Sequence, residues 1–263
     1  MPEPIIRELP SLSLPRLPSP DGRVPSVDRE TMLAADHIAT DGLGLGMLQM
    51  MENAGHQLAE LTRMTLGGRV SGRRVVVLAG TGNNAGGGMV AARRLAGWGA
   101  EVCVLYARPV LRLRPGPCAQ LEPMLASGVR AAVARHDMTG AELTAEIQAA
   151  DAVLDALIGY SLSGPPDEGY ATLIELADKA RGPVISLDLP SGIDASTGDR
   201  PGRAVRADAT LALALPKRGM RRGEGARFSG VGYLADIGIP ASIFAELGVA
   251  VDGLFAPGPL IRL

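Results

Sequence analysis

Aromatic residues are scarce in this sequence, at 3% of 263 residues, whereas apolar residues make up 46%. The core must therefore be built from Val, Leu, Ile, Ala and Met. Only two cysteines are present, Cys103 and Cys118, so a disulfide framework is excluded, and no Cys and His spacing suggests zinc. The net charge of −2 gives no electrostatic basis for binding nucleic acid or an anionic membrane surface.

The sequence also lacks long apolar stretches. No run approaches the roughly 18 apolar residues that a membrane span needs. The first twenty residues contain six prolines and no sustained apolar run, which excludes a typical secretory signal. We therefore expect a cytoplasmic protein, with residues 1–23 forming a disordered or loosely docked extension and residues 24–263 forming a single domain.

From residue 74 onward, short apolar runs alternate with helical patterns. This alternation predicts a parallel sheet with helices on both faces, an α/β fold. We expect strands at residues 74–79, 101–106, 129–134, 152–157, 184–189 and 209–214, and helices near 89–98, 141–150 and 169–180. Two helices should precede them, the first capped by Ser26. The run RGEGAR at 222–227 is typical of a flexible, solvated loop.

The stretch GTGNNAGGG at residues 80–88 lies between a predicted strand and a predicted helix. Gly80, Gly82 and Ala85 match the dinucleotide fingerprint G-x-G-x-x-G/A, in which phosphates sit at a helix N-terminus. The acidic residue that should end the next strand is missing, and Arg108 stands near that position. An arginine there could bind a 2′-phosphate, so an NADP-dependent dehydrogenase stays open, as does a simple turn role for the two asparagines.

Polar residues also interrupt or follow two of the apolar strands. Asp155 lies in VLDALIG, and Asp188 and Ser191 lie in SLDLPSG. In a doubly wound sheet these residues and the glycine-rich loop should meet at the carboxyl edge of the strands. A carboxylate in an apolar strand is costly unless it is paired or bound to a cation. Amide, carboxylate and hydroxyl oxygens together suit a hard cation.

Six blocks in register resemble the NAD(P)H-hydrate epimerase family, also called the YjeF N-terminal domain, over about residues 24–240. The matching blocks are VPSVDRETMLAADHIATDGLGLGMLQMMENAG, GTGNNAGGGMVAARRLAGWGAEVCVLY, DALIGYSLSGPP, SLDLPSGIDASTG, VRADATLALALPKRG and YLADIGIP. The resemblance implies a three-layer α/β/α Rossmann-like sandwich, often a homodimer. It also implies an isomerase that interconverts the R and S epimers of hydrated NADH or NADPH (NADHX and NADPHX) for metabolite repair.

The resemblance further implies which residues form the site. Potassium would be held by Asn84, Asp155 and Ser191. The substrate would contact two segments and one aspartate, namely Asn83, Asn84, Ala85, Gly86 and Gly87, then Gly159, Tyr160, Ser161, Leu162, Ser163, Gly164 and Pro165, and finally Asp188. As a hypothesis, the ring nitrogen expels the C6 hydroxyl, Asp188 protonates it as it leaves, and water then returns to the other face with Asp188 as the base.

The chain departs from the family pattern N-N-G-G-D-G at Ala85 and Gly87, so a carboxylate expected beside the substrate is absent. This departure favours a second hypothesis, a non-catalytic nucleotide- or protein-binding module of the same fold. Lys217, one of only two lysines, occupies a family-like position, and we expect its role to be structural. Because the chain ends at Leu263, we expect any dehydratase partner to be a separate protein.

Overall fold

The centre of the molecule is one sheet of eight strands, described over residues 14–20 and 22–263 in a computed structural model. The strands follow the order β3-β2-β1-β4-β5-β6-β7-β8, and every neighbouring pair is parallel except β7 and β8. Their bounds are β1 Arg74–Ala79, β2 Glu101–Tyr106, β3 Arg130–Val133, β4 Ala152–Ala156, β5 Val184–Leu187, β6 Ala209–Leu213, β7 Val231–Ala235 and β8 Leu260–Arg262. The prediction of a mostly parallel α/β sheet is confirmed.

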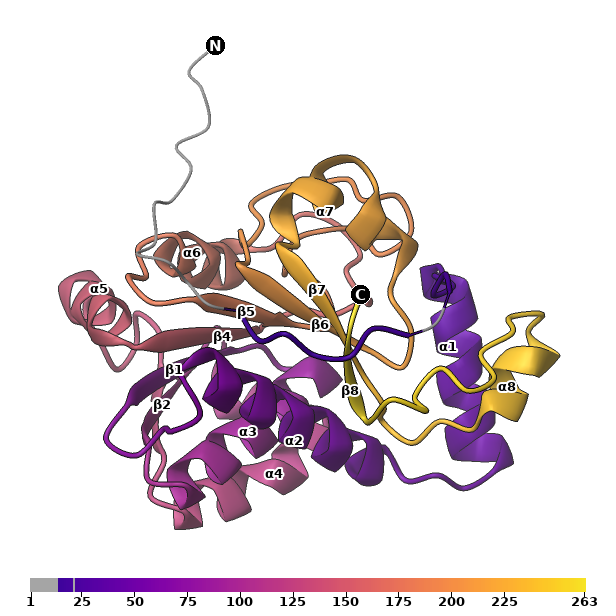
Figure 1. The fold of residues 1–263 in the computed structure, drawn as a ribbon. Helices are drawn as coiled ribbons and strands as arrows, with labels where there is room; N and C mark the ends of the chain where they lie inside the picture. Colours follow the sequence, from indigo (N-terminus) through magenta and orange to yellow (C-terminus); the bar gives the residue numbers. More distant parts are fainter. Residues whose placement is uncertain (1–13, 21) are drawn as a thin grey trace.

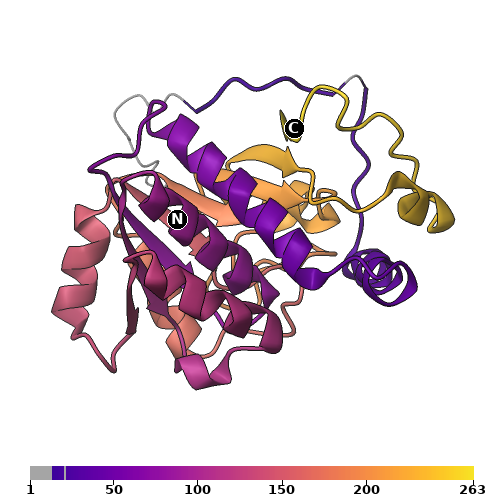
Figure 2. The ribbon, with the colours of Figure 1, turned by 90° about the horizontal axis from the view of Figure 1, so that it is seen from below.

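Helices cover both faces of this sheet, as Figure 1 shows. Helices α2, α3 and α4 pack on one face, and α5, α6 and α7 pack on the other. The helix bounds are α1 Arg29–His37, α2 Met47–Thr65, α3 Asn83–Gly97, α4 Pro115–Ala126, α5 Gly140–Ala149, α6 Glu168–Ala177, α7 Gly223–Phe228 and α8 Ala241–Glu246. The three-layer α/β/α sandwich is therefore confirmed, with α1 and α8 together beyond one end of the sheet (Figure 2).

The continuous apolar strands are buried on both faces, as their sequence predicts. In β1, Val75 and Val77 join the core under α2 and α3, whereas Val76 and Leu78 join the core under α5 and α6. This alternation follows from the two-residue period of a strand, which sends successive side chains to opposite faces. A strand between two helical layers therefore needs an apolar residue at every position.

The order of the strands places a topological switch point beside β1. The chain runs outward from β1 through β2 to β3, and then returns to place β4 and β5 on the other side of β1. In open α/β sheets the crevice at such a point, outside the carboxyl ends of the strands, is where ligands bind. The sequence predicts that the first, fourth and fifth strands are neighbours. In the structure β1, β4 and β5 are adjacent in that order.

Helix α3 begins at Asn83, earlier than the sequence pattern indicated, so most of the glycine-rich stretch is helical. Gly86, Gly87 and Gly88 have no positive φ, and their lack of a side chain serves packing. A Cβ at Gly86 would come within 2.6 Å of the Met51 sulfur, and one at Gly88 within 2.5 Å of the Ala156 Cβ. The glycines therefore bring α3 close to α2 and to the sheet, at a cost in helix propensity.

Helix α1 is capped by Asp28, not by the predicted Ser26. The Asp28 carboxylate accepts a hydrogen bond of 2.9 Å from the Thr31 amide. Val27, just before it, is extended because it forms a parallel bridge with Lys217 and accepts a 2.7 Å hydrogen bond from the Arg218 amide. This pairing joins the start of α1 to the segment that carries Lys217.

Several elements were not predicted. These are α4, β7, β8, α8 and the short helix α7, which occupies the stretch expected to be a flexible loop. Phe228 at the end of α7 is buried and packs under that helix, which explains why this glycine-containing run is ordered. Within the described residues, no helix has the length and apolar character needed to cross a membrane.

Part of the proline-rich segment runs along the sheet edge. The Tyr233 hydroxyl of β7 donates a 2.9 Å hydrogen bond to the Pro15 carbonyl, and the Arg262 amide of β8 donates one of 2.9 Å to the Pro18 carbonyl. Leu14 and Leu17 pack against the core. Residues 1–13, most of the predicted extension, lie outside the described residues.

Candidate active site

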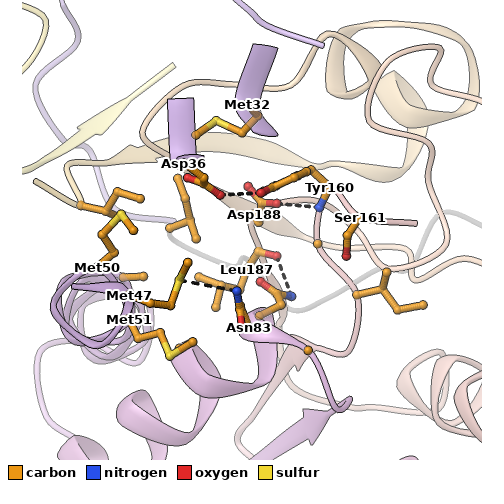
Figure 3. Close-up of a pocket in the computed structure, with 18 of the residues that line it drawn as sticks. Met32, Asp36, Met47, Met50, Met51, Asn83, Tyr160, Ser161, Leu187 and Asp188 are labelled. Atoms are coloured by element: carbon orange, nitrogen blue, oxygen red, sulfur yellow. Dashed lines mark hydrogen bonds between the residues drawn. The ribbon is translucent and has the colours of Figure 1, made fainter. Parts of the chain in front are cut away.

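A cavity of about 450 Å³ opens at the switch point (Figure 3). Its walls come from α1, the turn after it, the start of α2, the start of α3, and the segments that follow β1, β4, β5 and β6. Seven of the predicted site residues line it, namely Asn83, Asn84, Gly87, Gly159, Tyr160, Ser161 and Asp188. Met47, Met50 and Met51 add an apolar wall, so the cavity combines apolar surface with a few polar groups.

Asp188 follows β5 directly and has a φ of 70°, a conformation that is uncommon for residues other than glycine. Its amide donates a 2.7 Å hydrogen bond to the Leu211 carbonyl, and its Oδ2 accepts one of 2.8 Å from the Tyr160 amide. The side chain is buried. Strained residues of this kind persist where the surrounding structure over-determines them, and they concentrate at functional sites.

Lys217 is 1% exposed, and its ammonium forms an ion pair with the other oxygen of Asp188, Oδ1. Lys217 Nζ also donates a 2.8 Å hydrogen bond to the Leu213 carbonyl and lies 5.7 Å from the centroid of the Tyr160 ring. We expected a purely structural role for Lys217. Its ammonium also faces the cavity and Asp188, so a structural role alone does not describe it.

A second carboxylate in the cavity, Asp36 of α1, was missed by the sequence analysis. Its Oδ2 accepts a hydrogen bond from the Tyr160 hydroxyl, as the dashed line in Figure 3 shows. Desolvation by burial raises the pKa of Asp36, opposed by the Tyr160 hydrogen bond and by the charge of Lys217. In the sequence, Asp36 is one more polar residue on an amphipathic helix.

Behind the cavity, Asp155 and Ser191 form a fully buried polar cluster. Asp155 accepts four hydrogen bonds, from the Ser191 hydroxyl at 2.5 Å, the Ser191 amide at 2.9 Å, the Ser186 hydroxyl at 2.7 Å and the Leu157 amide at 3.2 Å. Desolvation raises the pKa of Asp155, although these hydrogen bonds favour the ionised form. Within the part of the chain that the structure describes, no basic side chain pairs with Asp155.

Asn84 lines the cavity at the start of α3. Its Nδ2 donates a 3.3 Å hydrogen bond to the Leu187 carbonyl, and a Cβ added at Gly159 would lie 3.4 Å from its Oδ1 and 2.8 Å from Asp188 Oδ2. A bare glycine is thus needed where the loop passes these two side chains. No cluster of three or more His, Cys, Asp or Glu is found among residues 14–20 and 22–263.

The oxygens of Asn84, Asp155 and Ser191 nevertheless fit a hard, weakly charged cation. They are an amide, a carboxylate and a hydroxyl, with no soft ligand. The buried Asp155 charge lacks a basic partner among the described residues, and a nearby cation would offset the desolvation that raises its pKa. Neither Asp155 nor Ser191 lines the cavity itself, so such a cation would lie at its inner wall.

The other predicted site residues do not line the cavity. Ala85 and Gly86 face the packing between α3 and its neighbours, and Leu162, Ser163, Gly164 and Pro165 continue beyond it. The Leu162 carbonyl accepts a 3.3 Å hydrogen bond from Arg29, which connects this loop to α1. At Gly87, which departs from the family pattern, a Cβ would come within 2.9 Å of Leu187 Cδ2, so a side chain there requires Leu187 to move.

The dinucleotide fingerprint has a packing explanation at its first glycine. A Cβ at Gly80 would come within 2.1 Å of the Leu157 carbonyl oxygen, so the close passage of β1 and the segment after β4 requires glycine there. Arg108, the candidate for binding a 2′-phosphate, forms an ion pair of 2.6 Å with Asp167. These contacts explain the first glycine of the fingerprint by packing and the arginine by an ion pair.

The fold and cavity define a Rossmann-like α/β protein with an acidic and a basic side chain paired at the switch point of its sheet. The chain belongs to the family described as YjeF-related protein N-terminus, whose model matches residues 47–219. The resemblance deduced from the six sequence blocks is therefore confirmed.

Curated relatives of the chain support this assignment. An "NAD(P)H-hydrate epimerase" of Dehalogenimonas lykanthroporepellens is 42% identical over 234 residues, which cover 88% of this chain and 90% of the relative. A relative of the same name in Weissella koreensis is 33% identical, covering 81% of this chain and 91% of its own. A "Bifunctional NAD(P)H-hydrate repair enzyme Nnr" of Hyperthermus butylicus is 37% identical over 70% of this chain but only 33% of its own length.

A solved structure has the same fold. The crystal structure of yeast ynu0, YNL200c, superposes with a TM-score of 0.76 and covers 91% of this chain and 100% of the yeast chain. At 23% identity this similarity concerns the fold alone.

Proposed function

We propose that the protein is an NAD(P)H-hydrate epimerase, an isomerase that interconverts the R and S epimers of NADHX and NADPHX. The observation that carries this proposal is the buried Asp188–Lys217 pair in a cavity at the switch point. The names of the relatives that match most of the chain support the substrate class. In NADHX a hydroxyl group sits on C6 of the nicotinamide ring, next to the ring nitrogen.

The reaction needs proton transfer but no redox step. The lone pair of the ring nitrogen forms a C=N bond to C6 as the C6–O bond breaks, and the hydroxyl leaves as water once it is protonated. Water then adds to the other face of the planar iminium and loses a proton, which restores the lone pair. We assign to Asp188 the acceptance of that proton, because its carboxylate lines the cavity and is held there by the Lys217 ammonium and the Tyr160 amide.

The start of α3 suits the diphosphate of the substrate. Gly82 and Asn83 lie in the cavity wall, and the first turn of a helix offers unpaired amides and the positive end of the helix dipole. In this proposal Asn83, Asn84 and Gly87 contact the substrate along this wall, and Gly159, Tyr160 and Ser161 contact it along the other.

A potassium ion is part of the proposal, held by Asn84, Asp155 and Ser191. When bound, the cation supplies positive charge that fixes the segments after β1, β4 and β5 relative to one another and attracts the anionic substrate. Asp155 then stays ionised under its four hydrogen bonds and does not exchange protons with the substrate.

We also propose that the enzyme acts in the cytoplasm as a homodimer and works together with a dehydratase activity. Both cysteines, Cys103 and Cys118, are free thiols, which is usual for a reducing compartment. The bifunctional relatives, of which this chain spans 33% to 41%, carry the word repair in their names and provide the precedent for a coupled activity.

The test is exchange between the two epimers of NADPHX, followed by NMR in the presence and absence of potassium. Catalysed exchange in potassium supports the proposal. Asp188→Asn should lower the rate about 10²–10⁴-fold, the usual contribution of a proton-transfer group. Binding without exchange would instead indicate a non-catalytic module, and hydride transfer from NADPH to a carbonyl would indicate a dehydrogenase.

A further inference from the structure

We propose that Asp36 is the acid that protonates the departing C6 hydroxyl and that Tyr160 is a positioning residue that holds Asp36 at the cavity. This inference rests on the epimerase function proposed above and deepens it. Both residues line the same cavity as Asp188, yet they come from distant parts of the chain, α1 and the segment after β4.

Tyr160 is fixed at three points around the cavity. Its hydroxyl donates to Asp36 Oδ2, its amide donates to Asp188 Oδ2 at 2.8 Å, and its ring lies 5.7 Å from Lys217 Nζ. Tyr160 thus connects the two carboxylates without competing for Lys217. The Oδ1 of Asp36 has no hydrogen-bond partner among the described residues, and we place the substrate hydroxyl there.

The contacts of Asp188 explain why the reaction needs a second carboxyl group as the proton donor. Both oxygens of Asp188 are already engaged, Oδ1 by the buried Lys217 ammonium and Oδ2 by the Tyr160 amide, so each acts as an acceptor. The ammonium of Lys217 is itself held by Asp188 and by the Leu213 carbonyl. Asp36 has no basic partner at ion-pair distance in the described part of the chain. No ion pair therefore holds its carboxyl group in the ionised form, and burial raises its pKa.

The proton transfers balance over one turnover. The Asp36 carboxylic acid donates its proton to the C6 hydroxyl, which leaves as water while the ring nitrogen forms the iminium. A water molecule adds to the opposite face of C6 and gives its proton to the Asp188 carboxylate. Water in the cavity returns that proton from Asp188 to Asp36, and the reverse direction uses the same groups in the opposite order.

The proposal predicts the direction of the pH dependence. The charged and titratable groups that face Asp36 are Tyr160, Lys217 and Asp188, and Arg29 lies near the Tyr160 hydroxyl. Burial raises the pKa of Asp36, so its acid form persists to higher pH than for a solvated aspartate. The rate should be sustained below that pKa and fall as the pH rises through it, because the donor proton is lost.

The experiment uses Asp36→Asn and Tyr160→Phe with NADPHX as the probe, and measures kcat, KM and the pH profile of epimer exchange. Asparagine keeps an acceptor for the Tyr160 hydroxyl but cannot give up a proton. We expect Asp36→Asn to lower kcat about 10²–10⁴-fold with little change in KM and to remove the high-pH limb of the profile. Tyr160→Phe should lower kcat less and shift that limb.

Asp41→Asn is the matched control. Asp41 lies in the helical turn after α1, five residues beyond Asp36, and pairs with His37 at an exposed position. It should keep the wild-type rate and profile. An Asp36→Asn enzyme with a wild-type kcat, or one that retains the high-pH limb, would overturn the proposal. If the wild-type protein catalyses no exchange at all, the proposed function fails instead, and the two failures are distinguishable.

Discussion

At the scale of single residues, the site depends on charges placed where water cannot reach them. Lys217 is 1% exposed and Asp188 is 3% exposed, so each desolvated charge relies on the other. Removing one member of a buried ion pair leaves the other as an unpaired buried charge. Replacing both with uncharged groups often leaves the stability unchanged. The left-handed backbone at Asp188 adds a constraint that asparagine, which tolerates φ > 0, can also meet.

We predict that Lys217→Met destabilises the protein by about 3–5 kcal/mol, because the Asp188 carboxylate is left buried without its cation. The double variant Asp188→Asn with Lys217→Met should recover most of this loss. Urea unfolding of the two single variants and the double variant measures the coupling free energy. Lys179→Met, at an exposed position, is the control and should change little. Additive effects in the double variant would contradict the prediction.

At the scale of elements, the contact between α2 and α3 positions the start of α3 in the cavity wall. Gly55 of α2 makes this contact possible. A Cβ at Gly55 would come within 2.4 Å of the Val90 Cβ and 2.5 Å of the Gly87 carbonyl oxygen. Since one of these atoms belongs to the backbone of α3, the two helices must separate to admit a methyl group.

Gly55→Ala should therefore destabilise the protein by about 1–3 kcal/mol, the usual cost of overpacking. Gly97→Ala, in the last turn of α3 with no atom within 4 Å of the added Cβ, should stabilise it by about 0.5–1 kcal/mol through helix propensity. Thermal unfolding of both variants tests the pair of predictions. Equal effects of the two substitutions would show that the α2–α3 contact is not as close as described.

The sequence predicted elements well where an apolar strand is buried on both faces. Six strands were placed within one or two residues of their bounds. Five of them are buried along most of their length, where period and length leave few alternatives, whereas β3 at the sheet edge is exposed to half-buried. β7 and β8 were missed, since a glycine interrupts β7 and β8 is three residues long. Helix α3 was placed too late because five of its first six residues are asparagine or glycine, and tertiary packing overrides their low helix propensity.

At the scale of the whole molecule, the cluster of Asp155 and Ser191 connects the neighbouring strands β4 and β5 at the switch point. Ser186 and Asp155 are paired across β4 and β5, and Ser191 follows β5. Under our proposal, a cation at Asn84 would bind only when these strands and α3 are assembled. Any ligand that binds the folded state alone stabilises it by mass action.

Potassium should accordingly raise the midpoint of thermal unfolding relative to an equal concentration of N-methylglucamine. The gain approaches about 2.7 kcal/mol at a concentration of 100 Kd. Asp155→Asn should abolish the difference between the two salts, whereas Asp199→Asn, at an exposed position outside the cluster, should retain it. A potassium effect that survives in Asp155→Asn would place the cation elsewhere.

The family, the parallel sheet and the sheet edge of the candidate site could be predicted from the sequence, because local apolar periods and motifs in a constant order are enough for them. Which charges meet depends on the tertiary structure. The Tyr160 hydroxyl and Asp36 are 124 positions apart, and neither their pairing nor that of Lys217 with Asp188 leaves a local pattern. Such contacts depend on how α1 and the segment after β6 fold over the switch point, and no residue spacing records that geometry.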